Sequence, residues 1–319
     1  MVFIGLWQNG PRNVNCNFPT GGRHMRAKQY IAGSAQEATA WQQALRRELF
    51  TILKLTDLLP HGAAGPLDPE ILSETECDGY CHRELEINST PGRRMPVILT
   101  LPLAAAGAAP AVVCIHGHGG DRYSPYDSAS IYKGFAHSLA AQGYVTIAVD
   151  VGQHEVFEEG RLLMGERLWD LWRCVDYLES LPQVDAGRIG CGGLSLGGEM
   201  AMWLGAMDER MRATLSSGFL TTMDQMEHNH CMCWKFAGLR ELVDYADIYA
   251  LTAPRALQCQ NGLEEPETQF NVPLARKTLG AIAPIYRDFN RPEQLALHVH
   301  AGGHEIDLPA LVEFFRAHL

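Results

Sequence analysis

The 319-residue chain is predicted to form an α/β domain whose mostly parallel sheet is flanked by helices, and three observations predict it. From Ala111 onward, short apolar runs alternate with segments of helical periodicity, which is typical of consecutive β–α units. Hydrophobic residues make up 46% of the chain and charged residues 20%, enough for a large core. A glycine-rich turn, GGLSLGG at 192–198, joins an expected strand to an expected helix.

The first 79 residues precede this alternation and are expected to pack on the main domain as an N-terminal extension. Residues 1–34 are irregular and rich in Gly, Asn and Pro, whereas 35–59 carry apolar residues at helical spacing and predict an amphipathic helix. HGAAGPLDPE at 61–70 breaks that helix. Two β-like segments, 80–88 and 95–101, are separated by STPGRR and predict an antiparallel pair that opens the catalytic domain, residues 80–319.

The β–α rhythm then continues to the end of the chain, with apolar, β-branched runs as strands and longer amphipathic runs as helices. The expected strands are 111–116, 144–150, 187–195, 212–218, 253–262 and 295–304. The expected helices are 128–142, 165–181, a segment ending near Met207, 272–288 and 308–318. A polar and aromatic insertion, about 219–252, interrupts the rhythm after the sixth strand of an eight-stranded type of sheet. Ligands of such sheets bind at the carboxyl ends of the strands.

Composition excludes several partner classes. The net charge of −11 (26 − 37) repels phosphate backbones and argues against nucleic acid. No run of about 20 apolar residues predicts a membrane span, and the N-terminal run lacks the basic flank of a secretory signal. The nine cysteines are odd in number and irregular in spacing, which favours a reduced, cytoplasmic protein, with Cys77 and Cys81 the best candidates for an exception.

The turn at 192–198 contains G-x-S-x-G, with Ser195 at its centre. On a sharp strand–helix turn a serine is held out at the edge of the sheet, and the flanking glycines let neighbouring backbone pass close by. The context favours a nucleophile over an ordinary turn serine. The backbone N–H of Leu196, at the start of the following helix, is then expected to face a developing oxyanion.

A serine hydroxyl needs a base, and His304 is the predicted one because it lies between the last strand and the last helix. The orienting acid is expected in the loop NGLEEPETQ, which offers Glu264, Glu265 and Glu267 and no aspartate. Glu265 is the first choice and Glu264 the alternative.

A second oxyanion donor is expected from the loop HGHGG at 116–120, where glycines free the backbone to turn its N–H groups inward. The N–H of His118 is the predicted donor. The imidazole of His116 is interpreted as structural, tying loops together by hydrogen bonds.

HNHCMCW at 228–234 and DVGQHE at 150–155 are expected on the rim of the site, with His154, His228, His230 and Trp234 as candidates for substrate contact. Two histidines and two cysteines within six residues also suggest a metal site. Cys231 and Cys233 are, however, only one residue apart and no second cysteine pair follows them, which argues against zinc. No metal and no organic cofactor is therefore expected.

The segments CIHGHGGD, GERLWDLWRCVDYL, GCGGLSLGGEMA, DIYALTAPRALQCQNG and GGHE together resemble the α/β-hydrolase superfamily, and within it the dienelactone-hydrolase-like and acetyl-xylan-esterase-like branches. The likeness covers roughly residues 80–319. It implies a triad of Ser195, Glu265 and His304, although relatives commonly carry Asp at the position of Glu265. Serine in place of the cysteine of the dienelactone hydrolases favours the esterases.

The leading hypothesis is thus a serine carboxylic-ester hydrolase that acts through an acyl-enzyme, and the resemblance suggests acetyl or methyl esters of carbohydrates as its substrates. The alternatives are a peptidase of the prolyl-oligopeptidase type, a non-catalytic binding protein on the same fold, and a zinc hydrolase. The expected partner is a small-molecule or carbohydrate ester, with neither nucleic acid nor membrane, and a homodimer is left open.

Overall fold

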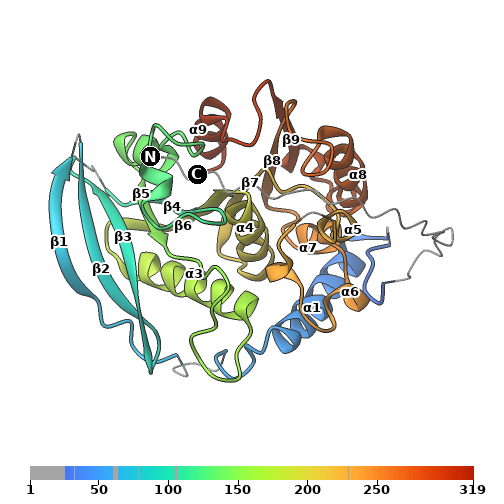
Figure 1. The fold of residues 1–319 in the computed structure, drawn as a ribbon, viewed down its shortest axis with the longest axis horizontal. Coiled ribbons are helices and arrows are strands. Elements are labelled where there is room, and N and C mark those ends of the chain that lie inside the picture. Colours follow the sequence, from blue (N-terminus) through green and yellow to red (C-terminus); the bar gives the residue numbers. More distant parts are fainter. Residues whose placement is uncertain (1–25, 32, 60–63, 78, 105–106, 229) are drawn as a thin grey trace, which may run out of the picture.

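A nine-stranded sheet forms the core of the computed structural model (Figure 1). Six adjacent strands of it run parallel, so their carboxyl ends lie along the same side of the sheet. The strand order is β1-β2-β3-β5-β4-β6-β7-β8-β9. This confirms the predicted α/β class. The structure describes residues 26–31, 33–59, 64–77, 79–104, 107–228 and 230–319.

The first three strands pair antiparallel, β3 pairs antiparallel with β5, and the strands from β5 to β9 pair parallel. A crossover places β4 between β5 and β6. The strands are β1 (Glu70–Cys77), β2 (Tyr80–Thr90), β3 (Arg93–Pro102), β4 (Ala109–Ile115), β5 (Val145–Val149), β6 (Val184–Leu194), β7 (Met211–Ser217), β8 (Ala256–Gly262) and β9 (Leu295–His300).

Helices cover both faces of the sheet, and each face has its own apolar core. One face carries α2 (Phe135–Ala141) and α9 (Leu308–His318), which pack on each other and on the central strands. The other face carries the remaining long helices, with α3 next to α4 and α8 next to α7 (Figure 1). These are α1 (Ala35–Ile52), α3 (Leu163–Ser180), α4 (Leu196–Met207), α7 (Tyr245–Ala250) and α8 (Val272–Asp288).

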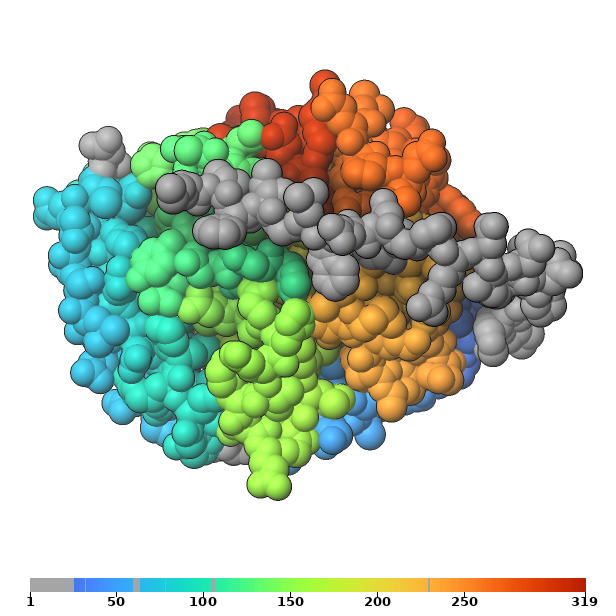
Figure 2. Space-filling model, viewed as in Figure 1, coloured from blue at the N-terminus to red at the C-terminus, as the bar shows by residue number. Residues whose placement is uncertain are grey.

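Strand β1 is the one strand that the sequence does not predict. It forms the left edge of the sheet in Figure 1, and its segment lies at the left surface of the molecule in Figure 2. Seven of its eight residues are exposed, so no apolar alternation marks it, and backbone pairing with β2 alone defines it. The sheet therefore has nine strands instead of eight, and the insertion after the predicted sixth strand follows β7.

Two predicted helices are shorter than expected because left-handed residues interrupt them. The expected helix over 128–142 begins only at Phe135, since Lys133 and Gly134 have φ of 54° and 59°. The expected helix over 35–59 ends at Ile52, two residues before Lys54 with φ of 57°. A run of αR backbone cannot pass through such residues.

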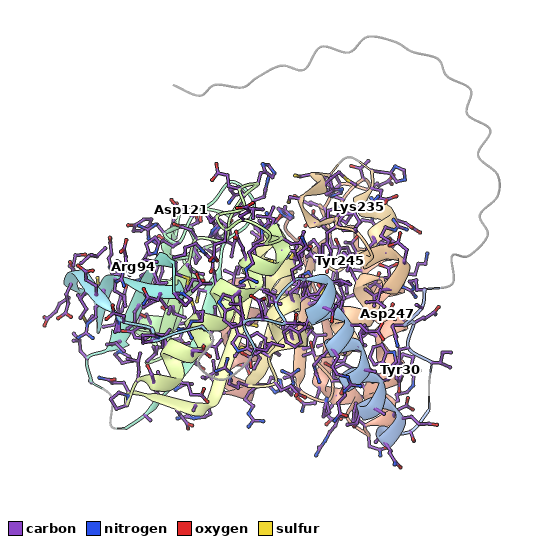
Figure 3. All side chains as sticks on the ribbon, turned by 90° about the horizontal axis from the view of Figure 1, so that it is seen from below. Tyr30, Arg94, Asp121, Lys235, Tyr245 and Asp247 are labelled. Carbon is purple, nitrogen blue, oxygen red and sulfur yellow. The ribbon has the colours of Figure 1, made fainter. Side chains whose placement is uncertain are left out.

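The N-terminal segment is attached to the body through α1 and the residues before it. Leu45 and Leu49 of α1 are fully buried in the larger core. Tyr30 donates its backbone N–H to Asp247 at 3.1 Å, and Figure 3 shows both residues beside α1. The expected boundary near residue 80 falls between β1 and β2 of one sheet. The expectation about the first residues of the chain lies outside the described residues.

Among the described residues, no helix is both long enough and apolar enough to cross a membrane. Eight of the nine cysteines are described, and all eight are free, including Cys77 and Cys81.

Candidate active site

Ser195 occupies the turn between β6 and α4 in a backbone conformation that is rare outside glycine, with φ of 62° and ψ of −122°. Its N–H donates to Ser217 O at 2.9 Å, which ties the turn to β7. The flanking glycines are needed for space. A Cβ on Gly193 would lie 2.5 Å from Ile115 O, and a Cβ on Gly197 would lie 2.2 Å from the same oxygen. The G-x-S-x-G pattern thus follows from close approach of β4 to the turn.

His304 lies in the loop after β9, and its Nδ1 is 2.8 Å from Glu265 Oε1. The Glu265 side chain is 1% exposed, whereas that of His304 is 28% exposed. Glu264 and Glu267 are both exposed and make no side-chain contact with His304 among the described residues. Only Glu265 of the three is therefore placed to orient this imidazole.

One cavity of about 260 Å³ is shared by Ser195 and His304. No hydrogen bond joins their side chains in the described part of the chain, as is common before substrate binds. A larger, open hollow of about 640 Å³ runs along β8, β9 and α9, but Ser195 does not line it. The residues around the smaller cavity are His118, Ser195, Leu196, Glu199, Phe219, Met226, His230, Cys231, Cys233, Trp234, Gln269, Phe270 and His304.

Both expected oxyanion donors lie beside this cavity. Leu196 is the first residue of α4, and His118 follows β4 in the loop at 116–120. Neither backbone N–H donates to another described residue. The loop is held by Gly117, whose N–H donates to the Tyr132 hydroxyl at 2.6 Å.

His116 is structural, as the sequence suggests. It is buried, its Nδ1 lies 2.8 Å from Gly117 O, and its Nε2 accepts the N–H of Val151 at 2.9 Å. Because of burial its pKa is lowered, so the neutral form that accepts this bond is favoured.

Aromatic side chains line the wall next to His304. Phe270 stacks on the His304 ring with centroids 5.5 Å apart, and His230 meets Phe270 edge-on at 5.2 Å. Trp234 is buried in the same wall, and its Nε1 has no hydrogen-bond partner in the described structure. Of the candidates for substrate contact, His230 and Trp234 thus face the cavity.

The other two candidates lie outside the cavity lining. His228 is exposed, and His154 is exposed on the loop after β5. The Nε2 of His154 is 3.1 Å from His118 Nε2 and 3.0 Å from Cys231 Sγ. On the surface drawn in Figure 2, the yellow-green segment after β5 accordingly lies beside the golden insertion.

Sequence reasoning missed Glu199, which lines the cavity one helical turn after Ser195. It is buried, its Oε1 has no hydrogen-bond partner in the described structure, and its pKa is raised to about 7 by that burial, against the opposing effect of Arg167. The sequence feature that could have identified Glu199 is that it is the lone acidic residue in the otherwise apolar helix LGGEMAMWLGAM. Phe270 gave no comparable signal, because a single aromatic residue in a loop is common.

Two family profiles match the chain. The Prolyl oligopeptidase family matches residues 131–247, and the Abhydrolase family matches residues 25–162. The chain is 25% identical over 219 residues to YtaP of Bacillus subtilis (strain 168), a protein provisionally named as a hydrolase. The match covers 60% of this chain and 72% of that protein.

Solved structures share the fold at low identity. A Bacteroides fragilis NCTC 9343 protein, provisionally described as an acetyl xylan esterase, superposes with a TM-score of 0.74 at 17% identity, over 92% of this chain and 91% of the other. A glucuronoyl esterase from Solibacter usitatus gives a TM-score of 0.68 at 18% identity, over 94% and 98% of the two chains. The sheet, the family profiles and these likenesses together show that the chain belongs to the α/β-hydrolase superfamily.

Proposed function

We propose that the protein is a serine carboxylic-ester hydrolase that acts through an acyl-enzyme. The observation that carries the proposal is the arrangement of Ser195, at its strained turn, in one cavity with His304, whose Nδ1 is bonded to buried Glu265. A nucleophile, a base and an orienting acid are the three parts that acyl transfer requires.

In the proposed reaction, Ser195 Oγ attacks the ester carbonyl while His304 Nε2 takes its proton. Glu265 accepts the Nδ1–H of His304 and stabilises the imidazolium that forms. The N–H groups of Leu196 and His118 donate to the tetrahedral oxyanion. His304 then protonates the leaving alcohol, and water attacks the acyl-enzyme by the reverse sequence of proton transfers.

The proposed substrate class is a carbohydrate ester, of the acetyl or methyl type. Two features support it. Structural neighbours include proteins described as acetyl xylan and glucuronoyl esterases. The cavity wall also offers aromatic faces, Phe270 and Trp234, beside His230, and apolar walls with a few polar groups are typical of small-molecule sites.

A peptidase is the second candidate, because the Prolyl oligopeptidase profile matches the segment that contains Ser195. The two candidates share the same triad and differ in the leaving group, an alcohol or an amine. Assays with p-nitrophenyl acetate and with a peptidyl p-nitroanilide of matched chromophore separate them. We expect ester turnover that exceeds amide turnover. Amide turnover without ester turnover would contradict the esterase proposal.

A panel of acetylated xylo-oligosaccharides, methyl glucuronate esters and simple alkyl acetates tests the substrate class. We expect a higher kcat/KM for sugar esters than for alkyl esters of the same acyl group. Equal values would remove the carbohydrate part of the proposal and leave the esterase part in place.

A further inference from the structure

Four metal-ligating side chains from three separate loops converge at the rim of the Ser195 cavity. His118 follows β4, His154 follows β5, and Cys231 and Cys233 belong to the insertion after β7. The ligand atoms of these four residues all lie within 4.8 Å of one another. The rest of the described chain holds no second cluster of this kind.

The distances are those of side chains directed at a common point. His154 Nε2 is 3.1 Å from His118 Nε2 and 3.0 Å from Cys231 Sγ. The Nε2 of His154 carries either one proton or one lone pair, so it can form a hydrogen bond with only one of these two atoms, His118 Nε2 or Cys231 Sγ. A cation between the four atoms would engage all of them.

We infer that His118, His154, Cys231 and Cys233 form a zinc site. Two thiolates and two imidazoles are a donor set that Zn²⁺ takes in tetrahedral sites. With Zn–N of about 2.1 Å and Zn–S of about 2.3 Å, tetrahedral geometry separates the ligand atoms by roughly 3.3 to 3.8 Å. The four ligand atoms need only small side-chain adjustments to reach these separations. Calcium and magnesium are disfavoured, because they require oxygen ligands.

The surroundings hold two of the ligand loops in place. Arg167 of α3 is buried and donates to the carbonyl of Gly152 at 2.6 Å, and it also contacts the carbonyl of Gln153, which fixes the loop that carries His154. The Gln153 side chain in turn accepts the N–H of Gly119 at 2.8 Å, next to His118.

Arg167 also links this support to the insertion. Its Nη1 is buried and has no hydrogen-bond partner among the described side chains and backbone. Arg167 lies beside Cys233. A Cys233 thiolate bound to zinc would offer an acceptor to this guanidinium.

The inferred site differs from the expectation drawn from the sequence. The one-residue spacing of Cys231 and Cys233, with no second cysteine pair, argued against zinc. The second pair of ligands is instead the two histidines, 113 and 77 residues earlier than Cys231 (231 − 118 and 231 − 154). Only the folded arrangement of three loops reveals it.

Four protein ligands leave no open position for water, so the inferred zinc is structural. It would clamp the insertion to the loop of His118, whose N–H is a proposed oxyanion donor, and so fix one wall of the Ser195 cavity. The inference concerns metal binding and stands independently of whether the protein hydrolyses esters.

The test is the zinc content of the purified full-length chain, incubated with ZnSO₄ and desalted, measured by inductively coupled plasma mass spectrometry. We expect one zinc per wild-type chain, loss of it in the Cys231→Ser/Cys233→Ser double variant and in His154→Asn, and full retention in the control Cys77→Ser. Cys77 is also free but lies on β1, outside the cluster. Absence of zinc from the wild type, or its full retention in the double variant, would overturn the inference.

A second measurement needs no variant and covers the case in which the double variant fails to fold. Co²⁺ in place of zinc should give thiolate-to-metal charge-transfer bands and the intense visible bands of a tetrahedral site, and ZnSO₄ should abolish both. Zn²⁺ should also raise the Tm of the wild type, since a ligand that binds the folded state stabilises it. Weak octahedral Co²⁺ bands without thiolate bands, or a Tm that does not change, would contradict the site.

Discussion

Glu265 Oε1 lies 2.8 Å from Nδ1 of His304, and the Glu265 side chain is nearly inaccessible to solvent while His304 faces the cavity of Ser195. An ionised carboxylate is only an acceptor, so the bond fixes the tautomer in which His304 carries its proton on Nδ1. The Nε2 lone pair is then free to act as a base. The proposed chemistry of Ser195 therefore depends on this pair.

Replacing Glu265 by glutamine should lower kcat/KM for an ester about 10²- to 10⁴-fold. The amide is nearly isosteric, but its NH₂ group can donate to Nδ1 and favour the wrong tautomer. The matched control is Glu264→Gln, one residue earlier and exposed, which should stay close to wild type. Steady-state kinetics, with thermal melts to confirm folding, measure both. A loss in Glu264→Gln with no loss in Glu265→Gln would contradict the assignment.

Gly197→Ala should lower the free energy of unfolding by about 1–3 kcal/mol, because the new Cβ would lie 2.2 Å from Ile115 O and force β4 and the turn apart. Gly280→Ala is the control. Gly280 lies in α8, and a Cβ at this position would meet no atom within 4 Å apart from the adjoining backbone of its own helix, so alanine should stabilise by about 0.5–1 kcal/mol through helix propensity. Chemical denaturation measures both, and similar stability of the two variants would refute the steric explanation.

Glu199→Gln should flatten part of the pH dependence of stability. The pKa of Glu199 is raised to about 7 in the folded chain and is about 4.3 in an unfolded one. Between these values the folded protein retains a proton that the unfolded chain has lost. The free energy of unfolding therefore falls as pH rises from about 4.3 to about 7, by up to about 4 kcal/mol from this group. Above pH 7 the contribution of this group no longer changes with pH.

The glutamine variant lacks that titration, so its stability relative to wild type should rise with pH across the same window. Denaturation of both proteins at several pH values gives the difference, which removes the effect of all other groups. Parallel curves for the two proteins would contradict the prediction.

Arg93→Ala should cost about 3–5 kcal/mol of stability. Arg93 of β3 binds both oxygens of Asp170 of α3, at 2.9 and 2.5 Å, and the side chains are 12% and 5% exposed. Its removal leaves a buried carboxylate without its cation. Arg316→Ala breaks the exposed pair with Glu313 and should leave stability nearly unchanged, because solvent screens that pair. Equal effects in urea denaturation would show that burial of the first pair is unimportant.

Local sequence pattern predicted the elements whose side chains alternate between core and solvent. The boundaries of α8 and α9 agree with the expected 272–288 and 308–318, since amphipathic periodicity and capping residues coincide there. Strand β1 was not predicted, because both of its faces are exposed and no apolar alternation marks it. The late start of α2 was not predicted either, because positive φ at Lys133, a non-glycine residue, has no reliable sequence signal.

In the candidate site, too, some residues could be located from local sequence context and others only from the fold. Ser195 and His304 could be located because strand–turn–helix context fixes where such residues stand along the chain. The sequence could rank Glu265 above Glu264 only by its place in a loop, whereas their difference in burial depends on how that loop folds. The cluster of His118, His154, Cys231 and Cys233 depends on three loops meeting in space, which no spacing rule along one segment captures.

The most direct test is the trapping of the acyl-enzyme. The protein is mixed with p-nitrophenyl acetate, quenched in acid within the first turnover, digested and mapped by mass spectrometry, with Ser195→Ala as the control. We expect a burst of about one equivalent of p-nitrophenol per chain and an acetyl group on Ser195, both absent from the variant. An acetyl group on another residue, or an undiminished burst in Ser195→Ala, would contradict it.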